Sequence, residues 1–258
     1  MNTNVNAKEN KLFYSDVFKV RAYEAGPDGR VIIQSVFNYL QDIASSHAFL
    51  MGVAVDRLQE QNLTWVLSRM HIRMESYPFW MRRIRIDTWP AVKDKYYAVR
   101  DFRLFDEKNR EIGLASSSWM MINTVTRRSV ALPGYMDKFQ NAELGRAMND
   151  GFKKLPEIDN MENEKNFNVR LSDLDMNRHV NSVHYLSWAL DTVPPQIWMD
   201  YRLTDVEINY RNECHYGDRV NSRSERKAEG DSCSFIHQLF KEKDRDELTR
   251  LRTRWQRK

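Results

Sequence analysis

The chain has 258 residues, of which 41% are hydrophobic and 12% aromatic, enough for a substantial core, which excludes a globally disordered protein. This length fits one large domain or two of ordinary size. No stretch approaches the roughly 18–20 consecutive apolar residues of a membrane-spanning helix. The net charge of +4 is only mildly basic.

The first ten residues are polar and resemble neither a secretory signal nor a transit peptide. We therefore expect a cytoplasmic protein. Cys214 and Cys233 are too few for a disulfide framework and lack zinc-site spacing, so we expect reduced thiols. We also expect no metal and no cofactor.

Basic residues gather in short runs. Residues 249–258 carry five basic side chains and no acid. Such runs suit an acidic partner, whether nucleic acid, anionic lipid or an acidic protein. Solvated strand faces explain any single residue equally well. The other basic residues of this kind are Arg82, Arg83, Arg85, Lys93, Lys95, Arg127 and Arg128.

The first predicted element is a helix over residues 36–51, because its apolar residues fall at helical spacing and Gly52 can end it in a left-handed turn. Strand-like runs follow, and the last two are joined by a turn at residues 106–109. These runs are residues 64–74, 83–89, 96–105 and 111–123.

A segment of different composition comes next. It contains Pro133 and Gly134, a possible helix over residues 135–148 and an acidic, polar run. We interpret residues 133–168 as a linker between an N-terminal unit, residues 1–132, and a C-terminal unit, residues 169–258.

The C-terminal unit repeats the order of the first. A helix over residues 180–191 ends before Pro194, and strand-like runs follow at residues 204–214, 219–226, 233–241 and 247–256. A helix followed by an antiparallel meander is an α+β pattern, because the helix must bury its apolar stripe against the sheet. Two such units predict a pair with pseudo-two-fold symmetry.

A polar cluster precedes the second helix. Asp175, Asn177 and His179 alternate, so an extended backbone would point them the same way. The unpartnered N–H groups of a helix start can hold a polarised oxygen. Together these groups suit ester or thioester hydrolysis, although Asp and Asn before a helix are also common caps. Residues 28–35, before the first helix, lack the alternation, which favours a specialised site.

Longer stretches resemble a known family. DLDMNRHVNSVHY (residues 173–185) closely resembles the signature of the acyl-acyl carrier protein thioesterases of plant plastids and bacteria. VEINYRNEC (residues 206–214) resembles the family's strand that ends in Glu-Cys. Residues 38–44, 65–71, 75–89 and 115–128 resemble its N-terminal helix and strands. The resemblance covers about Tyr14 to Trp255.

The resemblance implies a tandem, or double, hot-dog fold, in which an antiparallel sheet wraps each of two central helices. It implies hydrolysis of fatty acyl-acyl carrier protein to free fatty acid, which terminates fatty acid synthesis. Acyl specificity would lie in the N-terminal unit and catalysis in the C-terminal unit. By position, the catalytic residues would be Asp175, Asn177, His179 and Glu213, and Cys214 matches a cysteine once proposed as nucleophile. A bacterial cytoplasmic member fits best.

For the mechanism we expect direct attack of water. Glu213 or Asp175 would be the general base, and Asn177 and His179 would orient water or the carbonyl. A backbone N–H at the start of the second helix would complete the oxyanion site. The rival is a Cys214 thiolate activated by His179, which the neighbouring carboxylate of Glu213 disfavours.

The substrate pocket should be a long apolar tunnel, since burial contributes about 0.8 kcal/mol per CH₂ group. Its candidate wall residues are Phe37, Leu40, Trp65, Met70 and Trp119. The expected partner is the acidic acyl carrier protein, with no nucleic acid and no membrane span, and the chain could be a monomer or a homodimer. An acyl-coenzyme A thioesterase of the same fold is the alternative. A non-enzymatic basic binding protein would leave the polar cluster unexplained.

Overall fold

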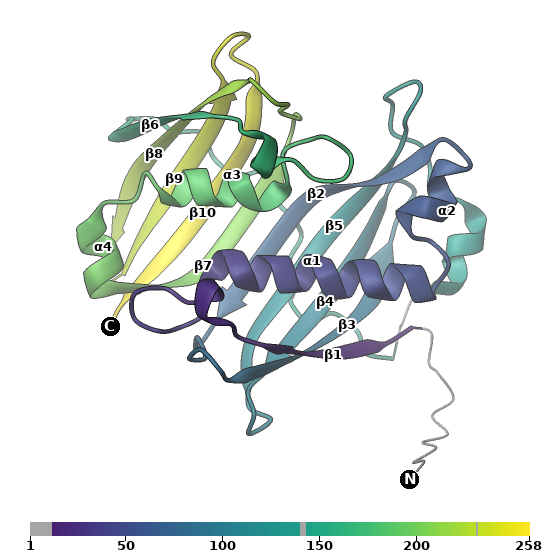
Figure 1. Cartoon of the computed structure of the whole chain (residues 1–258), viewed down its shortest axis with the longest axis horizontal. Helices are drawn as coiled ribbons and strands as arrows, with labels where there is room; N and C mark the ends of the chain where they lie inside the picture. The colour runs from purple at the N-terminus through teal and green to yellow at the C-terminus, as the bar shows by residue number, and fades with distance from the viewer. Residues whose placement is uncertain (1–11, 140–142, 231) are drawn as a thin grey trace.

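A single antiparallel sheet organises the whole chain (Figure 1). The computed structural model describes residues 12–139, 143–230 and 232–258. The strand order is β1-β3-β4-β5-β2-β7-β10-β9-β8-β6, so strands of the first half occupy one side and strands of the second half the other. The halves join where β2 pairs with β7, from Arg69 opposite Asn209 to Arg73 opposite Asp205.

The first half contains the predicted helix and four long strands, with ends shifted by a few residues. Strand β1 and helix α2 were not predicted, and β1 is a sheet edge whose mostly exposed side chains give no clear apolar alternation. The elements are β1 (Tyr14–Lys19), α1 (Ile33–Leu50), α2 (Val55–Gln59), β2 (Leu63–Met74), β3 (Arg83–Lys93), β4 (Tyr97–Phe105) and β5 (Glu111–Asn123).

The second half repeats the order strand, central helix, short helix and four strands. Strand β6 falls inside the segment interpreted as linker, and Pro195 begins α4 at a position that needs no backbone N–H. The elements are β6 (Asn163–Asn168), α3 (Ser182–Leu190), α4 (Pro195–Asp200), β7 (Tyr201–Tyr210), β8 (Arg219–Glu229), β9 (Ser232–Lys241) and β10 (Glu247–Arg257).

The helix expected over residues 135–148 is not formed in its described part. A 3-10 helix, η2 (Gly134–Phe139), is followed after residue 142 by turns and bends. Side chains of the sheet form hydrogen bonds with backbone groups that would bond to each other within a helix. Trp89 Nε1 donates to the Gly145 carbonyl at 2.9 Å, and the Ala147 N–H donates to Asp101 at 2.7 Å.

The two central helices lie on the same face of the sheet (Figure 1). On α1, Phe37, Leu40 and Ile43 are fully buried, and one apolar core runs under both helices and both halves. The start of α3 contacts the middle of α1, where Ser182 Oγ donates to Gln41 Oε1 at 2.9 Å. The helices therefore meet at the boundary between the halves.

The segment between β5 and β6, the connecting segment, crosses the opposite face of the sheet. Met70 and Ile72 lie in the core, so His71 between them faces away from the helices. There Asp150 contacts His71 at 2.6 Å, and farther along the Leu155 carbonyl accepts from Arg250 at 2.8 Å. Because the segment supplies these partners, the sheet can bury polar side chains on this face. No helix of the described residues is long and apolar enough to cross a membrane.

Candidate active site

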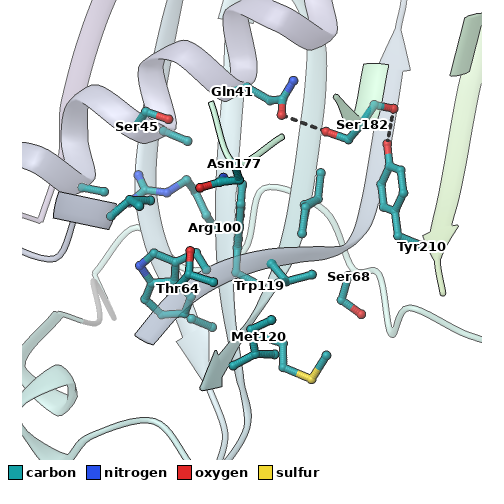
Figure 2. A pocket seen from close by; sticks show the side chains of 18 of the residues that line it. Gln41, Ser45, Thr64, Ser68, Arg100, Trp119, Met120, Asn177, Ser182 and Tyr210 are labelled. Carbon is teal, nitrogen blue, oxygen red and sulfur yellow. Dashed lines mark hydrogen bonds between the residues drawn. The ribbon is translucent and has the colours of Figure 1, made fainter. Parts of the chain in front are cut away.

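A cavity of about 1190 Å³ lies where the two halves meet. Its lining comes from α1, the start of β2, the end of β7 and the loop before α3, and it includes Asp175, Asn177, His179 and Glu213. Figure 2 shows Asn177 in this cavity together with Thr64 and Trp119. The structure therefore brings together all four residues implied by the family resemblance.

The loop that carries the polar cluster is closed, which corrects the expectation of an extended approach. The Asp175 N–H donates to the His179 carbonyl at 2.8 Å, and the Arg178 N–H donates to the Asp175 carbonyl at 3.0 Å. Asp175 Oδ1 accepts from the N–H groups of Asn177 at 2.8 Å and His179 at 3.2 Å. Residues 175–179, named the catalytic loop after their expected role, are thus shaped by the carboxylate of Asp175.

The catalytic loop is fixed beside the end of β7. The Val180 N–H donates to the Cys214 carbonyl at 3.0 Å, which places His179 next to Glu213. The distance from His179 Nε2 to Glu213 Oε2 is 3.4 Å, and Arg127 forms an ion pair with the same oxygen. At 3.4 Å the imidazole lies beside the carboxylate, at a distance longer than the usual N–H···O hydrogen bond.

Helix α3 is capped by Asn181, not by the polar cluster. Asn181 Oδ1 accepts from the Val183 N–H at 3.2 Å, so Asp175 and Asn177 are not caps of this helix. Ser182, the first helical residue, is held from two sides, because its carbonyl also accepts from Tyr210 OH at 3.0 Å (Figure 2). The N–H groups of Val183 and His184 are already bonded to Asn181, through its Oδ1 at 3.2 Å and its carbonyl at 2.9 Å.

The first half contains a loop with the same backbone pattern. The Gly26 N–H donates to the Arg30 carbonyl at 2.8 Å, and the Gly29 N–H donates to the Gly26 carbonyl at 2.9 Å. Gly29 has a φ of 74° and Arg178, at the matching position, a φ of 63°. Residues 26–30 carry no imidazole and no carboxylate at the position of Asp175. The repeated loop thus carries the polar cluster only once.

The Cys214 thiol faces away from this cavity. Its side chain is fully buried, Sγ donates to Asp218 at 3.4 Å, and the residue does not line the cavity. Burial, followed by the negative charge of Asp218, raises the pKa of Cys214 to about 12. A thiol with this pKa is protonated near neutral pH and is a poor nucleophile.

The five expected wall residues separate into two groups. Trp65 and Trp119 line the cavity, whereas Phe37, Leu40 and Met70 lie in the apolar core and do not line it. On α1 the core residues face the sheet, and a neighbouring strip of the same helix lines the cavity. Neither this strip nor Tyr210 was expected from the sequence, and Arg127 was expected only as part of a basic run. The strip consists of Asn38, Gln41, Asp42, Ala44, Ser45 and Ala48.

A buried guanidinium also lines the cavity. Arg100 is 9% exposed and donates to His47 Nδ1 at 2.8 Å and to Thr88 Oγ1 at 3.2 Å. Burial lowers its pKa to about 10, and no carboxylate of the described residues forms an ion pair with it. Three strand spacings separate β4 from β7, so Arg100 lies on the order of 14 Å from the strand that ends at the catalytic centre.

Known proteins are similar to this chain in sequence and in fold. Residues 11–137 match the model of the acyl-ACP thioesterase N-terminal domain, and residues 157–257 match that of the C-terminal domain. The oleoyl-acyl carrier protein thioesterase 1, chloroplastic, of Arabidopsis thaliana is 30% identical over 281 aligned residues, which cover 97% of this chain and 78% of that protein.

Two solved structures resemble the whole chain. The 12:0-ACP thioesterase from Umbellularia californica superposes with a TM-score of 0.87 at 27% identity, covering 95% of this chain and 94% of that one. An acyl-ACP thioesterase from Bacteroides thetaiotaomicron superposes with a TM-score of 0.80 at 25% identity, covering 97% and 100%.

The fold is thus a double hot-dog, and the protein is a thioester hydrolase. The chain belongs to the acyl-ACP thioesterase family, whose members hydrolyse fatty acyl-acyl carrier protein.

Proposed function

We propose that this chain releases free fatty acids from acyl carrier protein by direct attack of water on the thioester. The observation that carries the proposal is the meeting of Asp175, Asn177, His179 and Glu213 in one cavity with room for an acyl chain. The part of the cavity that Trp65 and Trp119 line would hold the acyl chain. The catalytic loop would hold the thioester carbonyl.

We assign the base to Glu213. Asp175 Oδ1 already accepts two backbone N–H groups, so its main role is to shape the catalytic loop. Glu213 takes a proton from water as the water oxygen attacks the carbonyl carbon, a step worth about 10²–10⁴ in rate. His179 and the amide of Asn177 orient the water and carbonyl. A backbone N–H at the start of α3 helps to stabilise the oxyanion.

The tetrahedral intermediate then collapses. The C–S bond breaks, the fatty acid leaves with the new C–O bond, and the thiolate of the carrier receives the proton that Glu213 took. Since water is the nucleophile, no acyl-enzyme forms, which fits the buried and protonated thiol of Cys214.

The test is thiol release from a series of acyl-acyl carrier proteins. We expect Glu213→Gln to lower kcat by about 10²–10⁴ and Asp175→Asn to lower it less. Asp28→Asn is the matched control, because Asp28 Oδ1 accepts a loop N–H, that of Arg30 at 3.0 Å, in the first half. Full loss in Asp175→Asn with an active Glu213→Gln would move the base to Asp175.

A second observation concerns the carrier. Arg178 of the catalytic loop and the nearby Arg127 and Arg128 are exposed, which suits an acidic carrier protein. The value of kcat/KM should be higher for dodecanoyl-acyl carrier protein than for dodecanoyl-coenzyme A. The difference between the two values should become smaller as the salt concentration rises. Equal values at every salt concentration would favour the acyl-coenzyme A alternative.

The basic C-terminal run gives little support to a nucleic acid-binding function. Arg250 is buried against Glu247, and Arg252 and Arg254 pair with acids of β7. These charges hold strands together and are largely neutralised. A protein of this kind should not show steeply salt-dependent binding to DNA.

A cytoplasmic, bacterial origin remains our prediction, since the polar residues 1–10 lie outside the described part of the chain. The named plant relative is chloroplastic, so the comparison does not support this location. Fractionation of the source cells tests the predicted location. Sedimentation equilibrium separately distinguishes a monomer from a homodimer.

A further inference from the structure

We propose that Arg127, a residue of the first half, is a positioning residue for the carboxylate of Glu213. This inference rests on the proposed function, in which Glu213 takes the proton of the attacking water. It gives the N-terminal half a role in catalysis. The family resemblance implies only acyl specificity for that half.

The turn after β5 carries Arg127 to the catalytic centre. Asn123 ends β5 opposite Leu63, where β2 begins, and β2 pairs with β7. Because neighbouring strands are antiparallel, the C-terminal ends of β5 and β7 and the start of β2 lie on the same side of the sheet. Arg127 follows β5, Glu213 follows β7, and both line the cavity.

The turn itself is held firmly. The Asn123 side chain accepts from the N–H groups of Val125 at 3.0 Å and Thr126 at 2.9 Å, and the Arg127 N–H donates to the Asn123 carbonyl at 2.8 Å. Arg127 has a φ of 58°, which is uncommon for a residue with a side chain. The backbone at Arg127 is thus fixed, and its guanidinium reaches Glu213 although the side chain is 52% exposed.

Arg127 and His179 converge on one atom. Nη2 of Arg127 and Nε2 of His179 both contact Oε2 of Glu213. The guanidinium and the imidazole hold this carboxylate oxygen from two sides. With Oε2 held by two partners, Oε1 is the oxygen that we assign to the attacking water.

The next residue offers a matched control. Arg128 lies in the same exposed turn and carries the same charge, but it makes no ion pair with any described carboxylate. Arg127→Ala and Arg128→Ala therefore remove equal charge from the same region, and both weaken long-range attraction of an acidic carrier alike. Their difference isolates the contact with Glu213.

In steady-state thiol release with dodecanoyl-acyl carrier protein, we expect Arg127→Ala to lower kcat by about 10- to 100-fold, because a misplaced catalytic group costs this much. Arg128→Ala should change KM and leave kcat within about twofold of wild type. Arg127→Lys should recover part of the loss, because an ammonium group keeps the charge but not the planar fork.

The second part of the test removes the positioned group. In a Glu213→Gln background, Arg127→Ala should lower kcat by less than about twofold further, since groups that act as a unit are not additive. Melting temperatures of all variants show whether each is folded. If Arg127→Ala fails to fold, the Arg127→Lys variant supplies the same comparison.

Two different failures can be told apart. Equal kcat in Arg127→Ala and Arg128→Ala, with Glu213→Gln inactive, overturns the positioning role and leaves the proposed function intact. A fully active Glu213→Gln variant overturns the assignment of the base, and with it the role of Arg127. A full loss from Arg127→Ala in the Glu213→Gln background means that Arg127 acts by another route and also overturns the inference.

Discussion

At the residue scale, burial decides what Cys214 can do. The family resemblance and its place next to Glu213 made it a candidate nucleophile. Its Sγ, however, is enclosed beside Asp218 and away from the cavity. A cysteine becomes reactive where positive charge or a helix start stabilises the thiolate. Here the environment stabilises the protonated form instead.

Cys214→Ala should therefore keep its thioesterase activity. We expect kcat to stay within about threefold of wild type, since the buried thiol is protonated at neutral pH. The free energy of unfolding should fall by about 1 kcal/mol, because a buried sulfur is lost. Thiol release and urea unfolding measure the two effects. Abolished turnover in a variant with normal stability would restore the thiol as nucleophile.

At the scale of elements, the catalytic loop shares its backbone with residues 26–30 but not its residue types. Arg178 adopts the left-handed conformation that Gly29 adopts in the first half. Glycine reaches this conformation without steric cost, whereas a β-branched residue does not. Arg178→Gly should thus leave the free energy of unfolding within about 1 kcal/mol, and Arg178→Val should lower it by about 1–2 kcal/mol. Equal urea unfolding curves for the two variants would argue against this conformation.

The connecting segment depends on a titratable contact. His71 lies between Asp150 of the segment and Asp205 of β7. Burial lowers its pKa, but the two carboxylates outweigh burial and raise it to about 9, above the ordinary value of 6.5. Protonated His71 then stabilises the fold fully below pH 6.5, and this contribution is lost as pH rises through about 9.

Urea unfolding between pH 6 and pH 10 tests this linkage. Wild type should lose stability over the alkaline part of the range, and His71→Gln should lose less, because it has no proton to release there. Parallel profiles for the two proteins would show that His71 does not bind its proton as described.

At the scale of the whole molecule, the halves share one sheet and one core. Strand β2 pairs with β7, and the apolar core includes Leu40 of the first half and Leu186 of the second. We therefore expect one cooperative unfolding transition, in which the calorimetric and van't Hoff enthalpies agree. Two separate transitions, or a stable protein made from residues 1–132 alone, would contradict this view.

The repeated order of elements could be predicted from the amino-acid sequence. Helical and alternating apolar spacing reports which face of an element is buried, so the two central helices and eight of the strands could be placed. The edge strands β1 and β6 were missed because their side chains are mostly exposed. The alternation of Asp175, Asn177 and His179 indicated a polar site but left helix capping open. The family resemblance added Glu213 and the catalytic roles.

Which side chains line the same cavity depends on the packing of elements that are distant in the sequence. Phe37 and Gln41 occupy the same helix, yet one lies in the core and the other lines the cavity, because the sheet and the second half cover different sides of α1. The contact between Arg127 and Glu213 joins residues 86 positions apart. The periodicity of apolar residues describes near neighbours along the chain. Strand pairing brings together residues that are far apart in the sequence, and it places Arg127 beside Glu213.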